Sequence, residues 1–207
     1  MAITNGYATL DQVKAAARIT DNVDDALLEM AIESSSRLID SVCERRFYNA
    51  GTETHYYVPT NSYVLDIDDV PGTAITLETS SAADGVYDVS WVLSRDAQLE
   101  PLNRHSSGLT FPVTRIRAVG EYLFPMDSIG TSTVKVTAVF GFNAGTASIP
   151  MAIRQATIIS ALRVYKRLDS PLGIAGFGDL GAVRVSRVDP DIAAMVAPFR
   201  KHPPGIA

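Results

Sequence analysis

Cysteine, histidine and tryptophan are scarce in this chain of 207 residues, which carries one cysteine, three histidines and one tryptophan. The single cysteine, Cys43, excludes a disulfide within the chain and a cysteine-rich zinc site, and it is typical of a reducing compartment. The histidines, His55, His105 and His202, are far apart and show no metal-ligand spacing. We therefore expect neither a bound metal nor a cofactor.

Long apolar runs are also missing. The N-terminal residues MAITNGYATL have neither the basic start nor the apolar core of a signal peptide. The longest uncharged stretch, from Val136 to Ile153, contains glycines, an asparagine and a proline, so it predicts a strand, a turn and the start of a helix. We expect a protein of the cytosol, or of an assembly that is built there.

The remaining composition is that of an ordinary globular chain, with 46% hydrophobic and 20% charged residues. The length predicts one domain, or one domain with an insertion. The net charge of −5 argues against a general nucleic-acid binder. Residues 1–150 hold 10 Lys or Arg and 19 Asp or Glu, whereas residues 151–207 hold 8 and 4. This asymmetry predicts an acidic body with a basic C-terminal segment; a chance bias in a short segment is the alternative.

Two helices are predicted near the N-terminus. Thr9 and Gln12 form the pattern of a capping box, in which each side chain bonds a backbone N–H of the first turn. The acidic residues within 21–25 begin a longer helix of about five turns, because negative charge is favoured at a helix N-terminus. This helix ends near residues 44–47. Its predicted apolar face contains Leu27, Leu28, Ala31, Ser35, Leu38, Ile39 and Val42.

From about Thr52 to Thr146 the sequence becomes rich in β-forming residues, with turn signals such as Pro71-Gly72 and Asp84-Gly85 between the segments. This pattern predicts a run of antiparallel hairpins and excludes a βαβ unit. The predicted strands are residues 55–58, 63–67, 74–77, 86–89, 91–93, 113–119 and 134–142.

Helical signals return after the β-rich region. Ser148 is predicted to cap a third helix, with Pro150 near its first turn. A glycine-rich stretch and a short strand at residues 182–188 follow. Asp189 and Pro190 then begin a last helix that extends to about Phe199. The apolar stripe predicted for the third helix contains Ile153, Ile158, Ile159, Leu162 and Tyr165.

These elements together predict an α+β fold. Residues 1–51 and 147–207 are expected to form a helical bundle from the N- and C-terminal helices, with a C-terminal arm. Residues 52–146 are expected to form an antiparallel β module that is inserted into this bundle and projects from it.

Three motifs that could carry chemistry are better explained as structure. Residues 176–181 match G-x-G-x-x-G but follow a helix and precede a strand, the reverse of the order that a dinucleotide site requires. Asp66, Asp68 and Asp69 lack EF-hand spacing and are interpreted as a solvated acidic turn. Residues 105–107, His-Ser-Ser, show no nucleophile elbow and are interpreted as a polar loop. We expect no catalytic residues.

The C-terminal segment holds the candidate binding residues. Gly173, Gly176, Gly178 and Gly181 are predicted to form a hinge, because glycine tolerates unusual backbone angles. Basic and apolar residues follow it and form a predicted docking arm for an acidic partner. The alternative is one more core helix with a solvated basic edge. The arm residues are Arg184, Arg187, Ile192, Met195, Phe199 and Arg200.

Arg45, Arg46 and Phe47 end the second helix and admit two interpretations. The arginines can compensate the helix dipole while the aromatic side chain fills the core. Alternatively, the three residues form a contact between subunits, where arginine and aromatic residues are enriched. The neighbouring Cys43 is interpreted as a buried small residue and not as a reactive thiol.

The N-terminal pattern resembles the head-to-tail connector proteins of tailed phages, also called adaptors. The matching residues are Ile19-Thr20-Asp21, the acidic and apolar run 24–28, the serines 34–36, and the closing motif at residues 43–48. A second block, Ile149-Pro150 with Ile153, Ala156 and Leu162, is similar to the helix that follows the insertion in this family.

The resemblance implies a structural virion protein without catalysis. Such adaptors bind beneath the portal protein, form a ring that usually has twelve copies, extend the DNA channel and provide the platform for a stopper or tail-completion protein. It also implies a location in the neck, at the head–tail interface, after assembly in the host cytoplasm, and portal contact by residues 183–199.

The charge of the chain agrees with this function. DNA would pass through the channel without specific binding, since basic contacts would hold the phosphates. A ring of identical subunits also needs two unlike contact faces on each copy. The alternatives are another neck protein, such as a stopper, or a small hydrolase that uses His105.

Overall fold

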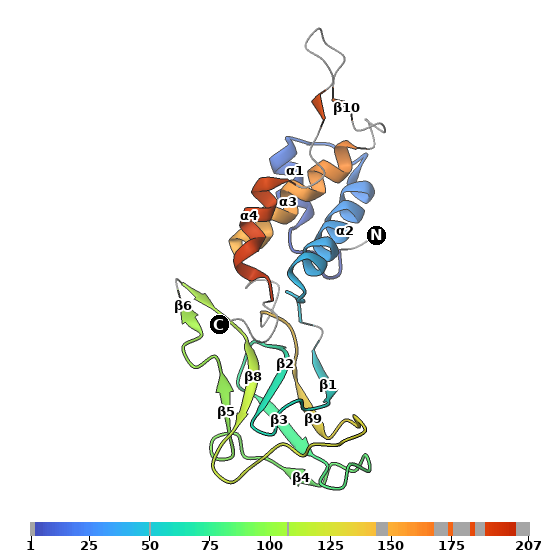
Figure 1. Cartoon of the computed structure of the whole chain (residues 1–207). Coiled ribbons are helices and arrows are strands. Elements are labelled where there is room, and N and C mark those ends of the chain that lie inside the picture. Colours follow the sequence, from blue (N-terminus) through green and yellow to red (C-terminus); the bar gives the residue numbers. More distant parts are fainter. Residues whose placement is uncertain are drawn as a thin grey trace. The chain divides into compact units, whose positions relative to one another are not determined.

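The computed structural model of the chain describes residues 3–49, 51–106, 108–143, 149–167, 174–175, 183–184 and 189–201. Its helices and antiparallel sheets confirm the predicted α+β class (Figure 1). The chain divides into two compact units, a helical unit from Met1–Glu44 and Ile149–His202 and a β unit from Arg45–Ser148. Within the described ranges, no helix is long and apolar enough to cross a membrane.

The first two helices begin where the sequence predicts. Helix α1 (Leu10–Ala17) follows a capping box in which the Gln12 N–H donates to Thr9 Oγ1 at 3.2 Å and the Thr9 N–H donates to Gln12 Oε1 at 3.0 Å. Helix α2 (Asp25–Cys43) has Asp24 at its cap position and ends at Glu44, whose φ of 55° is left-handed. A side-chain capping box therefore defines the start of α1, whereas the Asp24 side chain makes no cap bond at the start of α2.

The C-terminal part of the helical unit contains α3 (Met151–Lys166), α4 (Pro190–Val196) and the short 3₁₀ helix η2 (Ala197–Phe199). The Asp189 carboxylate accepts the Asp191 N–H at 2.9 Å, which confirms the predicted start of the last helix. Pro150 occupies the cap position of α3, so the predicted Ser148 cap is wrong. Strands β10 (Ile174–Ala175) and β11 (Val183–Arg184) pair antiparallel.

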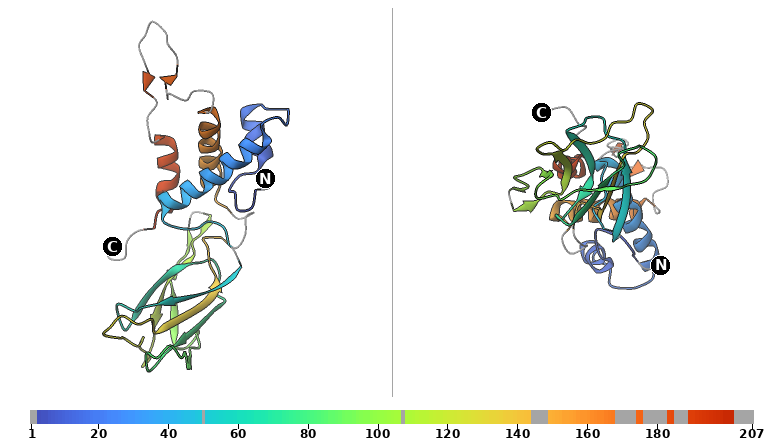
Figure 2. Two further views of the ribbon diagram at one scale, coloured as in Figure 1. Left: turned by 90° about the vertical axis from the view of Figure 1, so that its right-hand side faces the viewer. Right: turned by 90° about the horizontal axis from the view of Figure 1, so that it is seen from below.

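The helices pack through one face of α2, which contacts both α3 and α4 (Figure 2). Leu28 and Ile32 of α2 form a buried core with Val13 of α1 and Ala161 of α3. The predicted apolar face of α2 is only partly right, because Leu27, Leu38 and Val42 are exposed. Helix α2 carries apolar residues on two faces, and only one of them faces α3.

The β unit contains two main antiparallel sheets and one short hairpin. The first sheet has the strand order β1-β9-β3-β4, with β1 (Thr52–Tyr57), β9 (Val134–Val139), β3 (Ile75–Thr79) and β4 (Val89–Ser90). The second has the order β2-β8-β5, with β2 (Val64–Val70), β8 (Val113–Ala118) and β5 (Ala97–Glu100). The hairpin pairs β6 (His105–Ser106) with β7 (Leu109–Thr110).

The predicted run of sequential hairpins is wrong, although the antiparallel pairing is right. Strand β9 lies between β1 and β3, and β8 lies between β2 and β5, so late strands complete sheets that early strands begin. Residues 91–93 are not a strand. The Asp96 carboxylate accepts the Val92 N–H at 2.8 Å and holds this segment in a turn. Strand β5 was not predicted, because AQLE contains no β-branched or aromatic residue.

One core joins the two sheets of the β unit. It contains Leu65 and Ile67 from β2, Ile116 from β8 and Val136 from β9. Trp91 lies in the same core, where its ring stacks on Phe124 with a centroid separation of 4.9 Å and its Nε1 donates to Thr79 Oγ1 at 3.0 Å. The alternating burial of the strand residues thus points one face of each sheet inward.

Candidate functional site

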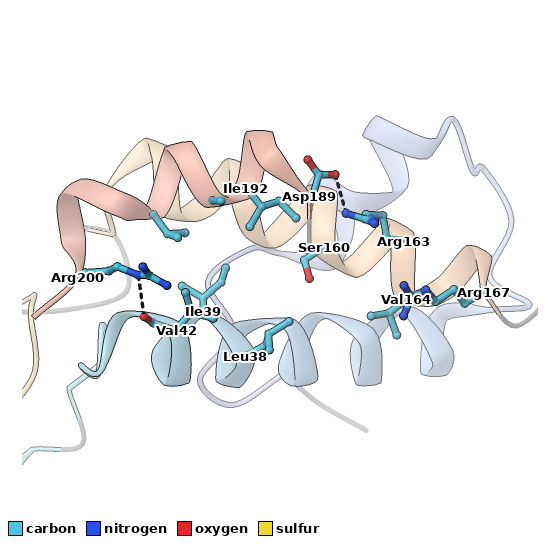
Figure 3. A pocket seen from close by; sticks show the side chains of 12 residues that line it. Leu38, Ile39, Val42, Ser160, Arg163, Val164, Arg167, Asp189, Ile192 and Arg200 are labelled. Atoms are coloured by element: carbon cyan, nitrogen blue, oxygen red, sulfur yellow. Dashed lines mark hydrogen bonds and ion pairs between the residues drawn. The ribbon is translucent and has the colours of Figure 1, made fainter. Parts of the chain in front are cut away.

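A groove with a volume of about 330 Å³ lies among helices α2, α3 and α4 of the helical unit (Figure 3). Its lining residues come from the three helices and from the residues that flank them. They are Leu38, Ile39, Val42, Ser160, Arg163, Val164, Arg167, Asp189, Ile192, Ala193, Val196 and Arg200.

The floor and walls of the groove are apolar. From α2, the lining includes the exposed side chains of Leu38 and Val42, and from α3 it includes the exposed Val164. Ile192 of α4 is half-buried, and the fully buried Val196 closes the base. Apolar side chains that stay in contact with water at a concave surface favour the binding of another apolar surface.

The rim of the groove is basic. Arg163 Nη1 pairs with Asp189 Oδ2 at 2.7 Å, and Arg200 Nε donates to the Val42 carbonyl at 3.3 Å (Figure 3). Arg167, at the end of α3, is exposed. Three guanidinium groups therefore stand against one carboxylate, which suits an acidic partner. The lining contains no His, Cys or Glu side chain, and its one carboxylate, Asp189, is paired with Arg163.

The predicted docking arm is divided by the structure. Arg200 is exposed and Ile192 and Met195 are half-buried, whereas Phe199 is only 3% exposed. The Lys201 N–H donates to the Cys43 carbonyl at 2.9 Å, and this bond ties the end of η2 to α2. Part of the segment is thus core, and its outer edge remains accessible.

The remaining arm and hinge residues are described less fully. Arg184 lies in β11, which pairs with β10, and nothing further is described for its side chain. Arg187 and the hinge glycines Gly173, Gly176, Gly178 and Gly181 lie outside the described residues. The hinge and the basic half of the arm stay predictions.

Arg45, Arg46 and Phe47 contact their own β unit. Phe47 is fully buried against Phe142, with ring centroids 5.2 Å apart, so it fills the core. Arg46 Nη2 lies 3.0 Å from Glu53 Oε1 and donates to the Phe140 carbonyl at 3.1 Å. The hydrogen bond from Arg46 lowers the pKa of Glu53, and burial opposes this shift. A role of these residues between subunits stays a prediction.

The acidic motif at residues 66–69 is not a solvated turn, so that interpretation is wrong. It belongs to strand β2, where Asp66 pairs with Arg115 of β8 at 2.7 Å and Asp69 is buried beside Arg45 at 3.6 Å. An ion pair across strands accounts for Asp66, and the buried Asp69 lies beside Arg45 from the segment before β1. Among the residues that the structure describes, no group of three or more His, Cys, Asp or Glu side chains could hold a metal ion.

His55, His105 and Cys43 make contacts within the fold; His202 lies outside the described residues. His55 Nδ1 lies 3.0 Å from Asp68 Oδ2 and its Nε2 lies 3.1 Å from Glu53 Oε2, so it joins strands of the two sheets. His105 Nδ1 contacts Thr110 Oγ1 at 2.9 Å across the β6–β7 hairpin, where the sequence predicted a loop. Cys43 is fully buried, as predicted, with its Sγ 3.9 Å from the Val196 carbonyl.

One surface escaped the sequence prediction. Val23, Leu27 and Met30 form an exposed apolar stripe at the beginning of α2 and in the turn before it. The spacing of i, i+4 and i+7 was a detectable signal. It was missed because Leu27 was assigned to the buried face of the helix.

Comparison with known proteins finds a family model that matches part of the chain. Residues 7–69 match the family described as "Phage gp6-like head-tail connector protein", which confirms the resemblance seen in the N-terminal residues. No curated protein matches the chain.

Solved structures match nearly the whole chain. One is from the neck of a native gene transfer agent particle computed with C12 symmetry, with a TM-score of 0.60 and 16% identity, and another is from the neck of an empty particle computed with C6 symmetry, with 0.59 and 15%. A third is from the virion of the native particle, with 0.58 and 18%. Each match covers 99% of this chain and 96% of the other, so the fold is shared over its full length.

Proposed function

We propose that this chain is a structural adaptor in the neck of a tailed phage or phage-like particle. It forms a ring under the portal, extends the DNA channel and provides the attachment platform for the next neck or tail protein. The observation that carries the proposal is the match of residues 7–69 to head-tail connectors, together with the shared fold of chains from a particle neck.

The symmetry of the related necks supports a ring. The structures with the same fold come from necks computed with C12 and C6 symmetry, and we infer a ring of twelve copies for this chain. Identical subunits close into a ring through unlike faces. The groove and the apolar stripe of the helical unit supply two such faces.

A role without catalysis fits the candidate site. The groove presents apolar side chains and guanidinium groups, which suit adhesion to another protein surface. The hydrolase alternative rests on His105, whose described contact is with Thr110 Oγ1 across the β6–β7 hairpin.

The helical unit is proposed as the connector core, a bundle of the N- and C-terminal helices, and the β unit as its inserted module. A stopper is the second candidate neck protein. The match of residues 7–69, which include α1 and α2, favours the adaptor. We further propose that residues 183–199 contact the portal, since Arg184 and Arg187 make this segment basic and half-buried Met195 leaves an apolar edge there.

The decisive experiment images the purified chain mixed with the portal protein of the same particle by electron cryomicroscopy. The proposal expects a ring of twelve copies on one face of the portal, coaxial with the channel. Failure to bind the portal, together with absence of the chain from purified infectious particles, would refute the adaptor function.

The portal contact has its own test. Replacing Arg184 and Arg187 with Glu should lower portal affinity at least tenfold while the thermal unfolding temperature stays unchanged, because both changes reverse charge in the proposed docking segment. The matched control reverses two charges on α3, Arg154→Glu and Lys166→Glu, and should retain affinity. Equal affinity of both variants would show that residues 183–187 do not dock.

A further inference from the structure

We propose that the groove of the helical unit receives the apolar and acidic surface at the start of α2 from a second copy of this chain. The inference rests on the proposed ring and names the contact that builds it. It commits to one occupant, residues 21–30 of the neighbouring copy, and to one direction, in which the start of one α2 meets the end of the next.

The first surface is an apolar ridge with acidic surroundings. Val23, in the turn before α2, is 86% exposed, and Met30 is 56% exposed; Leu27 lies three positions before Met30 on the same side of the helix and is also exposed. Residues 21–33 carry five carboxylates and no Lys or Arg, although Arg18 lies just before them. The apolar side chains of this ridge are removed from water only when another surface covers them.

Internal contacts hold this ridge in place. Lys14 Nζ pairs with Asp25 Oδ1 at 2.7 Å, and the Tyr165 hydroxyl donates to Asp24 Oδ2 at 2.6 Å. Asp21 accepts the Val23 N–H at 3.1 Å and remains exposed beside it. The turn is therefore fixed on its own unit while Val23 and Asp21 face outward, a preorganised arrangement that reduces the entropic cost of docking.

The second surface is the groove, which is apolar like the ridge and carries the opposite charge. Leu38, 54% exposed, and Val42 offer apolar contact. Arg167 and Arg200 are exposed at the rim, and the one carboxylate there, Asp189, is already paired with Arg163. An apolar ridge with carboxylates thus meets an apolar groove with guanidinium groups. Charge complementarity of this kind selects the partner and its register.

The positions of the two surfaces allow both to be used at once. The ridge is at the beginning of α2, whereas the α2 residues of the groove, Leu38, Ile39 and Val42, lie in its last two turns, and a helix of 19 residues is about 28 Å long. Val164 and Arg167 line the other end of the groove from α3, whose Tyr165 bonds Asp24 at the start of α2. Each copy can therefore bind one neighbour at each end. Pairing of two ridges would bring carboxylates together, so the unlike pairing is favoured, and unlike pairing is the kind that produces rings.

Disulfide trapping tests the contact. In rings assembled on the portal, the double variant Val23→Cys/Leu38→Cys should give, on oxidation, a ladder of covalent oligomers that extends to the full ring. Each single variant should stay monomeric on a denaturing gel, and mixing the two single variants should give heterodimers only. The native Cys43 is fully buried and serves as the background in all samples.

A matched control keeps the number of cysteines. The variant Val23→Cys/Gln155→Cys places the second thiol at an exposed position of α3 that does not line the groove, and it should give no ladder. Dimers from the Val23→Cys single variant would show ridge-to-ridge pairing and overturn the proposal. A groove occupied by the portal would appear as a crosslink from Leu38→Cys to portal cysteines, which also overturns it.

Charge reversal gives an independent readout. Asp21→Arg alone and Arg200→Glu alone, the latter at the guanidinium beside the end of α2, should each lower the yield of rings at least tenfold, and the combined variant should restore most of it. If the wild-type chain forms rings on the portal but the cysteine variant gives no ladder and the charge variants lose no yield, this contact is refuted and the adaptor function stands. Absence of any ring on the portal would refute both.

Discussion

At the scale of single residues, Gly141 shows how closely the β unit is packed. Its φ is +137°, and a Cβ built there would lie 2.2 Å from the Tyr48 carbonyl oxygen, while its N–H donates to the Asp69 carbonyl at 2.8 Å. We expect Gly141→Ala to lower the free energy of unfolding by about 2–4 kcal/mol, because backbone strain and a clash add. Urea denaturation measures this loss.

Gly130→Ala is the control that measures the free-energy cost of a positive φ alone. Gly130 has a φ of +82° but nothing within 4 Å of the added Cβ. Its loss should be about 1 kcal/mol, the cost of a positive φ without a clash. Equal losses for the two variants would contradict the close approach to Tyr48.

The pair of Arg46 and Glu53 makes a prediction about pH. The hydrogen bond from Arg46 lowers the pKa of Glu53 in the folded chain. The ionised carboxylate therefore stabilises the fold above the ordinary glutamate pKa of about 4.3, and this contribution disappears as the pH falls through the lower folded value. We expect the fall in melting temperature between about pH 5 and pH 3 to be smaller in Glu53→Gln than in the wild type. Glu121→Gln, at an exposed position, should behave as the wild type does; if Glu53→Gln does so too, the pair contributes nothing.

At the scale of elements, α4 and η2 raise the question of whether the last helical segment is core or arm. Phe199 is buried and Met195 is half-buried. Phe199→Ala should lower the free energy of unfolding by about 3 kcal/mol or more, whereas Met195→Ala should cost about 1 kcal/mol. Chemical denaturation with a circular-dichroism readout compares them. A Phe199→Ala variant as stable as the wild type would mean that the segment is a loosely attached arm.

An element could be predicted when the interactions that form it join residues close together in the sequence. The caps at Thr9 and Asp189 were predicted because their bonds join residues within three positions in the chain. Strand β2 was mistaken for a turn after Ile67, since its partner β8 begins more than 40 residues later and supplies Arg115 to Asp66. The order of strands in a sheet depends on such distant pairings, so the sequence indicated the antiparallel class and not the topology.

The candidate site divides in the same way. Arg200 and Ile192 were predicted for docking because they belong to a basic and apolar segment after the predicted glycine hinge, and the structure places both in the lining of the groove. The contributions of Leu38 and Val42 could not be predicted, because α2 has two apolar faces and tertiary packing alone decides which is covered. A groove among three helices is a property of their packing and of no single segment.

At the scale of the whole molecule, the proposed ring predicts how the free chain behaves. The ridge and groove are small surfaces, and association must overcome the loss of translational and rotational freedom. We expect a monomer in dilute solution by light scattering and a ring only in the presence of the portal. A stable dimer of the free chain would contradict this expectation, and the Arg200→Glu variant should be monomeric with or without the portal.

The division of the helical unit between the two ends of the chain has a consequence for synthesis. Helix α2 leaves the ribosome first, but α3 and α4, which complete its packing and line the groove, follow only after the whole β unit has been translated. The apolar residues of α2 that pack on α3 and α4 therefore stay uncovered while more than a hundred codons are translated. A prematurely terminated product has no groove, so translation itself ensures that only a chain made through α4 can receive a neighbour.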